Sequence, residues 1–372
     1  MMKAIFRKKF MVLSPDEVVT LLSNPDLAAE KANLQYISED DLCIMRRKRG
    51  KGYQYLHDGE PLKDDEVLER IKKLVIPPAW EKVKICPFSN GHLQVIGLDT
   101  KQRKQYIYHP DWTKLRNLTK FYKMTAFGKV LPKIRAQVDK DLDKKGMPQE
   151  KVLALVVRLM EETHIRIGNE AYAKQNKSYG LSTLRSRHVE ISSGEMKFNF
   201  LGKRGIENTV SVRDKKLIKL VNQCEEIPGW EVFKYIGEDG KKHSIDSGMV
   251  NHYIQELSGE LFSAKDFRTW SATKIFFEKL RDTGFTEEEK QNKKNILEAY
   301  DTTAEALNNT RSVCRSYYVH PYVVELYETG GIVPYFQKVE RKRTSKPNLS
   351  QTEEVLLEIL KDFEIELEEK ES

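Results

Sequence analysis

The residues of this sequence best suited to chemistry are basic side chains and a pair of adjacent tyrosines. Arg166 lies in IRIGNE, directly after a stretch of helical periodicity, and Lys203 lies in FLGKRG, between two stretches of alternating residues. Arg268 follows in KDFRT, and Tyr317 and Tyr318 lie in SYYVHP. Each also fits a structural role when taken alone, because an arginine at a helix end often caps it and paired tyrosines often pack in a core.

Several common catalytic motifs are absent, which narrows the possible chemistry. The chain has no G-x-x-x-x-G-K-[ST] phosphate loop, no G-x-S-x-G, no H-E-x-x-H and no K-x-D-G. Asp139, Asp141, Asp143 and Glu150 have the spacing of calcium ligands, but Lys144 stands where an EF-hand loop requires glycine. We therefore expect neither a nucleotide cofactor nor a metal.

Charge is distributed unevenly along the 372 residues. The net charge is +7, from 63 Lys+Arg and 56 Asp+Glu. Nine acids and only two lysines lie between Glu353 and Ser372, so this stretch carries −7 and the rest of the chain +14. Basic residues cluster near 46–51, 101–104 and 341–346. Three such clusters favour a polyanionic partner, most simply nucleic acid.

The cysteines and apolar segments indicate a cellular compartment. Cys43, Cys86, Cys224 and Cys314 form no C-x-x-C pair and resemble neither a disulfide-rich scaffold nor a zinc site. No stretch approaches the roughly 18 apolar residues of a membrane span, and the N-terminal apolar run is too short for a signal peptide. We expect a cytoplasmic protein with reduced thiols and no membrane partner, associated with nucleic acid through its basic clusters.

The residue pattern changes near position 112. Before it, short β-favouring segments alternate with turn signals, which predicts a small, mainly antiparallel sheet with one helix at 64–74. After it, helical periodicity dominates. The expected helices are 129–143, 149–163, 264–282, 293–307 and one that begins at 352. A β-hairpin is expected within 196–212, with Lys203 at its tip.

These elements predict an α+β chain of more than one domain, since 372 residues exceed the usual size of a single core. We expect an N-terminal extension (1–33), a β-rich domain (34–112), a mainly helical domain (113–340) and a basic-then-acidic C-terminal segment (341–372). The helix of that last segment is expected to be solvated and amphipathic, with its apolar side packed on the helical domain. An autoinhibitory mimic of DNA is the alternative for this acidic segment.

Taken in order, the segments that contain Arg166, Lys203, Lys265, Arg268 and Tyr318 resemble the type IB DNA topoisomerases. The compact poxvirus and bacterial form is the most similar. Further segments agree, namely IPPAW, ICPFSNGHLQ, GLDTKQRKQYIYHPDW and RIGNEAYAKQNKSYGLSTLRSRHV. The resemblance extends from about residue 34 to 335. It implies a β-rich N-terminal clamp domain and a helical catalytic domain of the kind shared with tyrosine recombinases.

The resemblance also implies roles. Tyr318 would attack a DNA phosphodiester and form a 3′-phosphotyrosyl link, whereas the adjacent Tyr317 is out of register with the family motif. Arg166 and Arg268 would bind the nonbridging oxygens, and Lys203 would protonate the leaving 5′-oxygen. Because cations supply the charge and the phosphotyrosine conserves the bond energy, neither a metal nor ATP is expected.

One position departs from the poxvirus pattern. Nine residues before Tyr318, where poxvirus enzymes carry a histidine, this chain has Asn309. Asparagine can donate a neutral hydrogen bond to a phosphate oxygen but cannot provide a positive charge. We expect Asn309 to contact the transition state in this weaker way.

Further DNA contacts are expected outside the reacting centre. Arg103, Tyr106 and Tyr108 are predicted to alternate along one strand, with both tyrosines on the same face. Phosphate contacts should dominate the affinity. The full expected DNA-binding set is Lys265, Arg103, Tyr106, Tyr108, Arg46, Arg47 and Arg49.

The predicted function is relaxation of supercoiled duplex DNA by a monomer. A tyrosine recombinase or integrase is one alternative, but these enzymes usually carry H-x-x-R where this chain has Lys265-Asp266-Phe267-Arg268. A non-catalytic DNA-binding protein on the same fold is the other. Binding alone does not require a nucleophile, so the set that ends in Tyr318 favours the enzyme.

Overall fold

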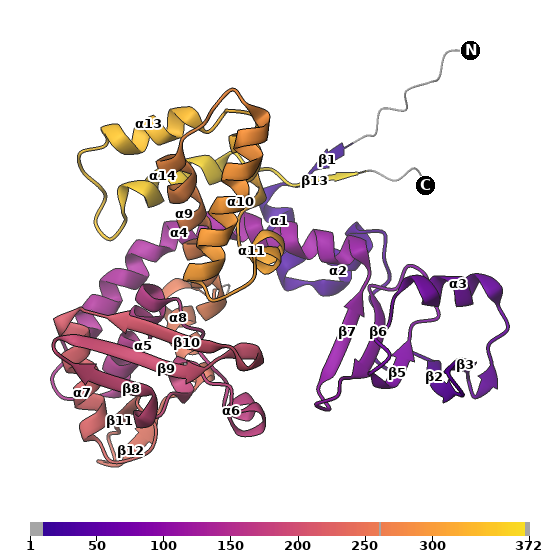
Figure 1. Ribbon diagram of the computed structural model, residues 1–372, viewed down its shortest axis with the longest axis horizontal. Coiled ribbons are helices and arrows are strands. Elements are labelled where there is room, and N and C mark those ends of the chain that lie inside the picture. Colours follow the sequence, from indigo (N-terminus) through magenta and orange to yellow (C-terminus); the bar gives the residue numbers. More distant parts are fainter. Residues whose placement is uncertain (1–9, 260–261, 369–372) are drawn as a thin grey trace. The chain divides into compact units, whose positions relative to one another are not determined.

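A computed structural model describes residues 10–259 and 262–368. These residues form two compact units (Figure 1): the described residues up to Tyr122 together with those from Glu364 onward, and Lys123–Phe363. Among the described residues, no helix is both long and apolar enough to cross a membrane.

The first unit contains a six-stranded antiparallel sheet. Its strand order is β4-β3-β2-β5-β6-β7. The strands are β2 (Ile44–Arg49), β3 (Gly52–His57), β4 (Glu60–Pro61), β5 (Glu81–Ile85), β6 (Leu93–Leu98) and β7 (Lys104–Tyr108). Helix α3 (Asp65–Lys73), capped by Asp64, buries Ile71 against Ile44 and Ile85 of the sheet. The predicted sheet with one helix at 64–74 is confirmed.

Both ends of the described chain meet in this unit. β1 (Phe10–Val12) pairs antiparallel with β13 (Glu366–Glu368), and α1 (Pro15–Ser23) and α2 (Pro25–Lys31) follow β1. The expected extension, 1–33, thus contains two helices. The expected C-terminal segment, 341–372, contributes to both units.

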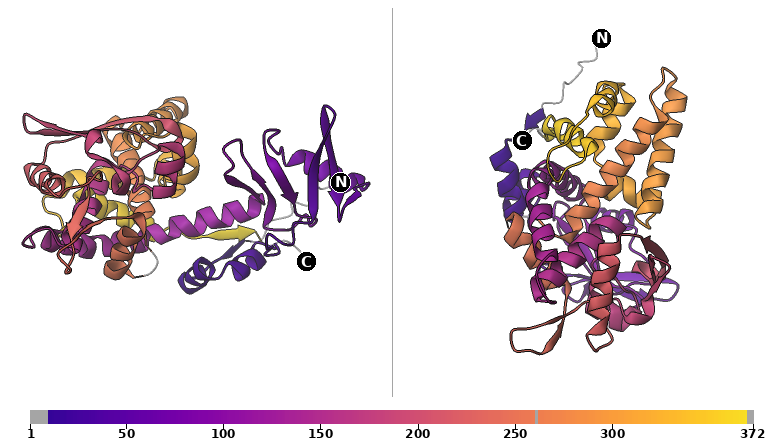
Figure 2. Two further views of the ribbon diagram at one scale, coloured as in Figure 1. Left: turned by 90° about the horizontal axis from the view of Figure 1, so that it is seen from below. Right: turned by 90° about the vertical axis from the view of Figure 1, so that its left-hand side faces the viewer.

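Helix α4 (Pro110–Leu142) is longer than the helix expected at 129–143, and Figure 2 shows it as one continuous helix. The expected domain boundary at 112/113 falls inside it. Gly128, directly before the expected start, lies inside the helix and has a packing role. A Cβ there would lie 2.4 Å from the Trp270 ring, so only glycine lets these helices approach so closely.

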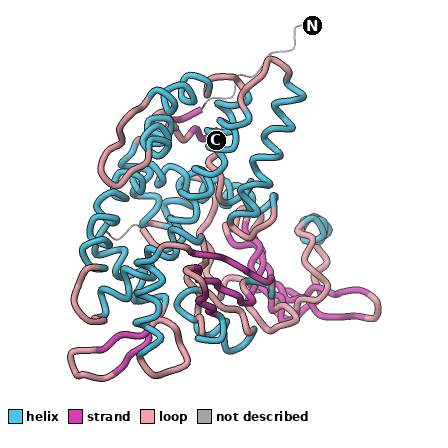
Figure 3. The backbone as a smooth tube through the Cα atoms, turned by 60° about the vertical axis from the view of Figure 1, so that its left-hand side comes forward, coloured by secondary structure: helices cyan, strands magenta, loops and turns pink. Residues whose placement is uncertain are grey.

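The second unit is mostly helical, as Figure 3 shows in cyan. The buried helix α5 (Gln149–Thr163) lies inside it, as its apolar sequence predicts. The other helices after α4 are α6 (Glu170–Asn176), α7 (Lys215–Glu226), α8 (Ser247–Ser258), α9 (Ala264–Thr283), α10 (Glu289–Ala306), α11 (Arg311–Tyr317), α12 (Pro321–Glu328), α13 (Val333–Arg341) and α14 (Gln351–Lys361). The expected helices at 149–163, 264–282, 293–307 and from 352 are confirmed with small shifts at their ends.

The predicted hairpin is also confirmed. β9 (Glu195–Leu201) and β10 (Glu207–Val212) pair antiparallel, with a short turn at Lys203–Gly205. β8 (Val189–Ser192) adds a third strand beside β9, and β11 (Lys234–Ile236) pairs separately with β12 (Lys242–Ser244).

Helix α14 differs from the expected solvated helix. Its first acids are buried, with Glu353 2% and Glu354 7% exposed. Glu353 pairs with Arg135 on α4, and Glu354 pairs with Lys342. Because Arg135 lies far away in the sequence, the local run of acids gave no indication that Glu353 would be neutralised inside the fold. The overall α+β class is confirmed.

Candidate active site

The C-terminal end of α5 places Arg166. The helix ends at His164, which adopts a left-handed conformation with φ of 54°. The chain then runs beside Gly180, where a Cβ would lie 2.4 Å from the Arg166 carbonyl oxygen. Leu181 N–H donates to that oxygen at 2.9 Å. The glycine in SYGLS thus permits the close backbone approach that fixes Arg166.

Arg268 lies in the second turn of α9 and is 5% exposed. Its Nη1 donates to the His164 carbonyl oxygen, and its Nη2 donates to the Leu307 carbonyl oxygen at 2.8 Å. Its Nε has no hydrogen-bond partner among the described residues. Burial and the nearby Arg166 cation lower the pKa of Arg268 to about 10. Two backbone carbonyls therefore orient the guanidinium.

Tyr318 lies at the C-terminal end of α11, next to Arg268. The Arg268 guanidinium carbon lies 5.5 Å from the centre of the Tyr318 ring. Thr273 on α9 donates its hydroxyl to the Tyr318 carbonyl oxygen at 3.2 Å and accepts from His320 N–H at 3.1 Å. These bonds hold the backbone on both sides of the tyrosine against the helix that carries Arg268. Tyr317, in contrast, is 49% exposed.

The surrounding cations change the acidity of Tyr318. Burial alone would raise the pKa of its phenol, but Arg268, Arg166 and Lys203 together lower it below the usual value. Three cations that stabilise a tyrosinate are the environment that a phenol needs in order to act as a nucleophile.

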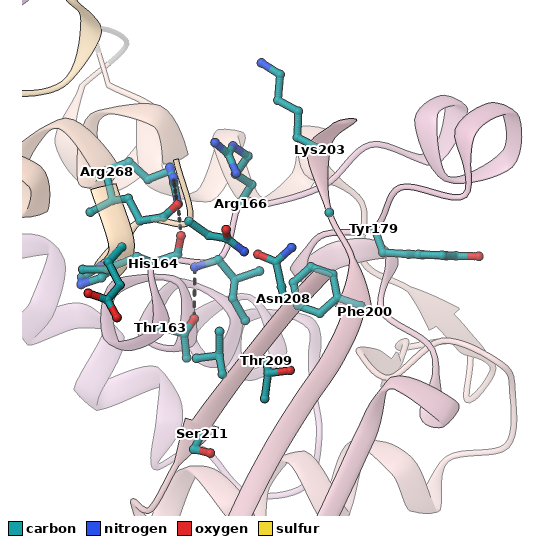
Figure 4. A pocket seen from close by; sticks show the side chains of 17 residues that line it. Thr163, His164, Arg166, Tyr179, Phe200, Lys203, Asn208, Thr209, Ser211 and Arg268 are labelled. Carbon is teal, nitrogen blue, oxygen red and sulfur yellow. Dashed lines mark hydrogen bonds between the residues drawn. The ribbon is translucent and has the colours of Figure 1, made fainter. Parts of the chain in front are cut away.

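Lys203 is exposed on the turn between β9 and β10. In Figure 4 it extends on the same side of the pocket as the Arg166 guanidinium. Partial burial lowers the pKa of Lys203, and the Arg166, Arg204 and Lys265 cations lower it further. A lysine with a lowered pKa gives up its proton more readily than a fully solvated one.

Arg166, Lys203 and Arg268 line a cavity of about 300 Å³ in the second unit. It is lined by the end of α5, the β9–β10 hairpin, the start of α9 and the end of α10, and Figure 4 shows Arg166, Lys203 and Arg268 around it.

Asn309 lies beside Arg166 and is bonded to it. Its Oδ1 accepts a hydrogen bond from Arg166 Nη2 at 2.7 Å. Its Nδ2 is buried and has no hydrogen-bond partner among the described residues. The neighbouring Asn308 donates from Nδ2 to the Glu207 carbonyl oxygen at 3.0 Å, which ties the end of α10 to the hairpin that carries Lys203.

The structure thus brings Arg166, Lys203, Arg268, Asn309 and Tyr318 into one cluster. Lys265 is exposed in the first turn of α9, where it acts on the pKa of Lys203. The sequence did not reveal Thr273 or the carbonyls of His164 and Leu307. Backbone acceptors leave no signature in side-chain motifs, and a buried threonine in a helix is common.

In the first unit, Tyr106 and Tyr108 share the exposed face of β7, as predicted. Their rings are 5.9 Å apart and nearly parallel at 14°. Arg103 differs from its prediction, because β7 begins only at Lys104. Asp99 accepts from the backbone N–H of Lys101 and of Arg103 and from Arg103 Nε at 2.8 Å. This turn places Arg103 before the strand.

The basic cluster on β2 divides in two. Arg47 and Arg49 are exposed, but Arg46 is half-buried and lies over the Tyr53 ring at 4.3 Å. It donates to the carbonyl oxygens of Ile76, Pro77 and Trp80, the last at 2.6 Å. The sequence groups Arg46 with the DNA-binding arginines, but the proline-rich segment uses most of its donors.

One group of possible metal ligands occurs among the described residues, and it lies in the first unit. The ligand atoms of Cys43, His57 and Asp58 lie within 4.8 Å of one another. None of these residues belongs to the tyrosine and arginine cluster.

Comparison with known proteins identifies the class. Residues 103–341 match the catalytic core of eukaryotic DNA topoisomerase I, and residues 52–99 match the N-terminal domain of bacterial DNA topoisomerase IB. The DNA topoisomerase 1B of Acanthamoeba polyphaga mimivirus is 35% identical over 294 residues, which cover 77% of this chain and 87% of the relative. The DNA topoisomerase 1B of vaccinia virus (strain Copenhagen) is 24% identical over 279 residues, which cover 72% and 84%.

The catalytic unit is thus of the DNA topoisomerase I class. With the matching N-terminal domain and the mimivirus relative, the chain belongs to the type IB DNA topoisomerase family, and it is an enzyme that acts on DNA. The resemblance inferred from its motifs is confirmed.

Proposed function

We propose that this enzyme relaxes supercoiled duplex DNA by cutting one strand through a 3′-phosphotyrosyl intermediate, allowing strand rotation and then resealing the strand. Tyr318 is the nucleophile. The observation that carries the proposal is the position of its phenol beside Arg268 and within reach of Arg166 and Lys203, whose charges outweigh burial and lower its pKa.

Tyr318 first releases its phenolic proton to solvent, and its oxygen then attacks the phosphorus. A new P–O bond forms to the tyrosine while the bond to the 5′-oxygen breaks. Arg268, held by two carbonyls, and Arg166, held by Asn309, stabilise the negative charge that develops on the nonbridging oxygens. The free Nδ2 of Asn309 adds a neutral hydrogen bond.

The leaving 5′-oxygen requires a proton, because an alkoxide is a poor leaving group. Lys203 supplies it from the hairpin turn, and its lowered pKa favours the transfer. Resealing is the reverse: the 5′-hydroxyl attacks the phosphotyrosine, its proton returns to Lys203, and the Tyr318 oxygen leaves. The bond energy is retained throughout, so the reaction proceeds without ATP.

No metal is essential in this scheme, since three protein cations provide the charge that a metal would otherwise supply. Lys265, Arg47, Arg49, Tyr106 and Tyr108 contact the duplex, mainly at its phosphates. We further propose that the enzyme acts as a monomer in the cytoplasm.

The test is plasmid relaxation in EDTA without nucleotide. Wild type is expected to relax the plasmid and Tyr318→Phe to be inactive. Tyr317→Phe is the matched control, because it removes the adjacent, exposed hydroxyl, and it should retain activity. An inert wild type, or a Tyr318→Phe variant that relaxes DNA, would contradict the proposal.

A further inference from the structure

The C-terminal helix α14 lies against α9 and α13 in the second unit (Figure 1). Its first acid, Glu353, is almost completely buried. Glu353 Oε1 accepts from Arg135 Nη2 at 2.7 Å and from Trp270 Nε1 at 3.0 Å, and its Oε2 accepts from Arg135 Nη1 at 2.9 Å. A buried carboxylate with all of these partners fixes the relative positions of the helices that carry them.

One of those helices, α9, carries Arg268, and the other, α4, is bonded to α5, which ends shortly before Arg166. Trp270 lies on α9, two residues after Arg268. Arg135 also donates from Nε to Glu161 of α5 at 2.7 Å. Three residues beyond Glu161, α5 ends at His164, whose carbonyl holds Arg268. One carboxylate on α14 thus connects the supports of both arginines.

The end of the same segment contacts the tyrosine region. Phe363 packs edge-on against the His320 ring, with ring centres 4.5 Å apart at 86°. His320 lies two residues after Tyr318 and donates its N–H to Thr273 of α9. The segment 351–363 therefore touches the elements that carry Arg268 and Tyr318.

The contacts among α4, α9 and α14 are tightly packed. A Cβ on Gly128 of α4 would lie 2.4 Å from Trp270 and 2.7 Å from Leu357 of α14. Thr125 of α4 donates its hydroxyl to the Leu360 carbonyl oxygen at 2.9 Å. A change at Glu353 must therefore be absorbed by movement of the helices themselves.

We propose that α14 positions the catalytic residues, with Glu353 as its central positioning residue, an inference that rests on the function proposed above. Glu353 touches no reacting atom and acts through Trp270 and Arg135. A displacement of about 1 Å at a reacting centre can cost about 100-fold in rate, so a defect at Glu353 reduces the cleavage step rather than DNA binding.

Glu354 is the matched control. It lies on the same helix, is also buried, and pairs with Lys342 at 2.7 Å. Lys342 directly follows α13 and lies on neither α9, α5 nor α11. Glu354→Gln thus removes the same charge from α14 without disturbing α9 or α5.

The experiment measures single-turnover cleavage of a duplex oligonucleotide and, separately, its dissociation constant. For Glu353→Gln we expect cleavage at least about tenfold slower with a dissociation constant near that of wild type. Glu354→Gln should cleave at nearly the wild-type rate. Wild-type cleavage by Glu353→Gln, or equal slowing in both variants, would overturn the inference.

Double variants separate positioning from general loosening of the fold. If Glu353 acts through Arg268, adding Glu353→Gln to Arg268→Ala should slow cleavage little further, whereas adding it to Lys203→Ala should multiply the two effects. Multiplication in both backgrounds would contradict the inference. Trp270→Phe, which removes the indole N–H together with part of the ring system, provides the decision if Glu353→Gln does not fold: slower cleavage is expected, and an unchanged rate would refute the Trp270 link. A wild-type enzyme that forms no covalent complex with DNA would contradict the proposed function itself. A wild-type enzyme that cleaves DNA, together with a Glu353→Gln variant that cleaves equally fast, would contradict only the role of Glu353.

Discussion

At the scale of single residues, the environment of Tyr318 is the feature that makes it suitable as a nucleophile. Its pKa is lowered although burial acts in the opposite direction, because Arg268, Arg166 and Lys203 converge on it. The order of motifs predicted which side chains would meet. It could not predict how they are held, since Arg268 is anchored by carbonyl oxygens of His164 and Leu307.

The pH dependence of cleavage should report both ionising groups. Under conditions that report the free enzyme, cleavage should rise with pH as Tyr318 loses its proton and fall at higher pH as Lys203 loses its own. Both pKa values are lowered, so the acid limb should lie below the ordinary tyrosine pKa of about 10.

A substrate with a 5′-thiol leaving group tests the fall in cleavage at high pH, which is assigned to Lys203. A thiol has a pKa near 8.5 and leaves without a proton, so the alkaline fall should disappear while the acid limb remains. The Lys203→Ala variant should be much slower than wild type on ordinary DNA and close to it on the thiol substrate. Equal slowing on both substrates would remove Lys203 from the role of general acid.

The hydrogen bonds of Arg268 predict that a positive charge alone at this position is insufficient for rapid cleavage. Lysine keeps the charge but cannot bind the His164 and Leu307 carbonyls and a phosphate at once. Arg268→Lys should therefore slow cleavage by about 100- to 1,000-fold, as expected for loss of an oriented donor in the transition state. Arg204→Lys, on the exposed hairpin turn, is the control and should cleave like wild type; comparable slowing in both would contradict this account.

At the scale of elements, periodicity predicted helices well where the signal was local. Asp266 reaches back to Ser263 N–H at 2.8 Å at the start of α9, and Gly284 with φ of 80° ends that helix. The hydroxyl of Ser263 contacts Asp266 instead of a backbone amide. Predictions failed where a residue serves a distant partner, as Gly128 does for Trp270 and Glu353 does for Arg135.

The burial of Glu353 predicts a particular dependence of stability on pH. Burial would raise the pKa of its carboxyl, but Arg135, the Ser350 N–H and Trp270 lower it from 4.5 to about 2. A lowered pKa stabilises the fold above the unfolded value of 4.5, and this contribution is lost as the pH falls toward 2. It amounts to about 3 kcal/mol at neutral pH.

Urea unfolding between pH 6 and 3 measures this contribution. Glu353→Gln should be less stable than wild type at pH 6, and the difference between the two free energies of unfolding should shrink as the pH falls. A difference that stays constant over this range would show that the ionised carboxylate is not the source of the stability.

At the scale of the whole molecule, the modest net charge of +7 is the sum of a basic stretch and an acidic C-terminal stretch. Part of the acidic C-terminal stretch is neutralised inside the second unit by Arg135, Lys342 and Lys338. The sequence predicted a chain of more than one domain and its α+β class. It did not predict that β1 and β13 pair, because strands of three residues from opposite ends of the chain carry too little pattern.

The exposed and half-buried arginines of β2 should differ in their effect on DNA binding. Arg47→Ala should reduce the slope of log affinity against log salt concentration by about one, the loss expected for one phosphate contact. Arg46→Ala should leave the slope nearly unchanged and instead reduce stability by about 1–3 kcal/mol, because three carbonyls lose their donor. Binding titrations over a range of salt, with thermal unfolding of both variants, would show the difference; a larger slope change for Arg46→Ala would reverse the assignment.

The central claim is that Tyr318 forms the covalent link to DNA. The most direct measurement traps the complex of wild type and a duplex oligonucleotide with detergent, digests the DNA and the protein, and identifies the modified peptide by mass spectrometry. The account predicts a nucleotide joined through its 3′-phosphate to Tyr318. A nucleotide on Tyr317 or on any other residue, or one joined through its 5′-phosphate, would contradict it.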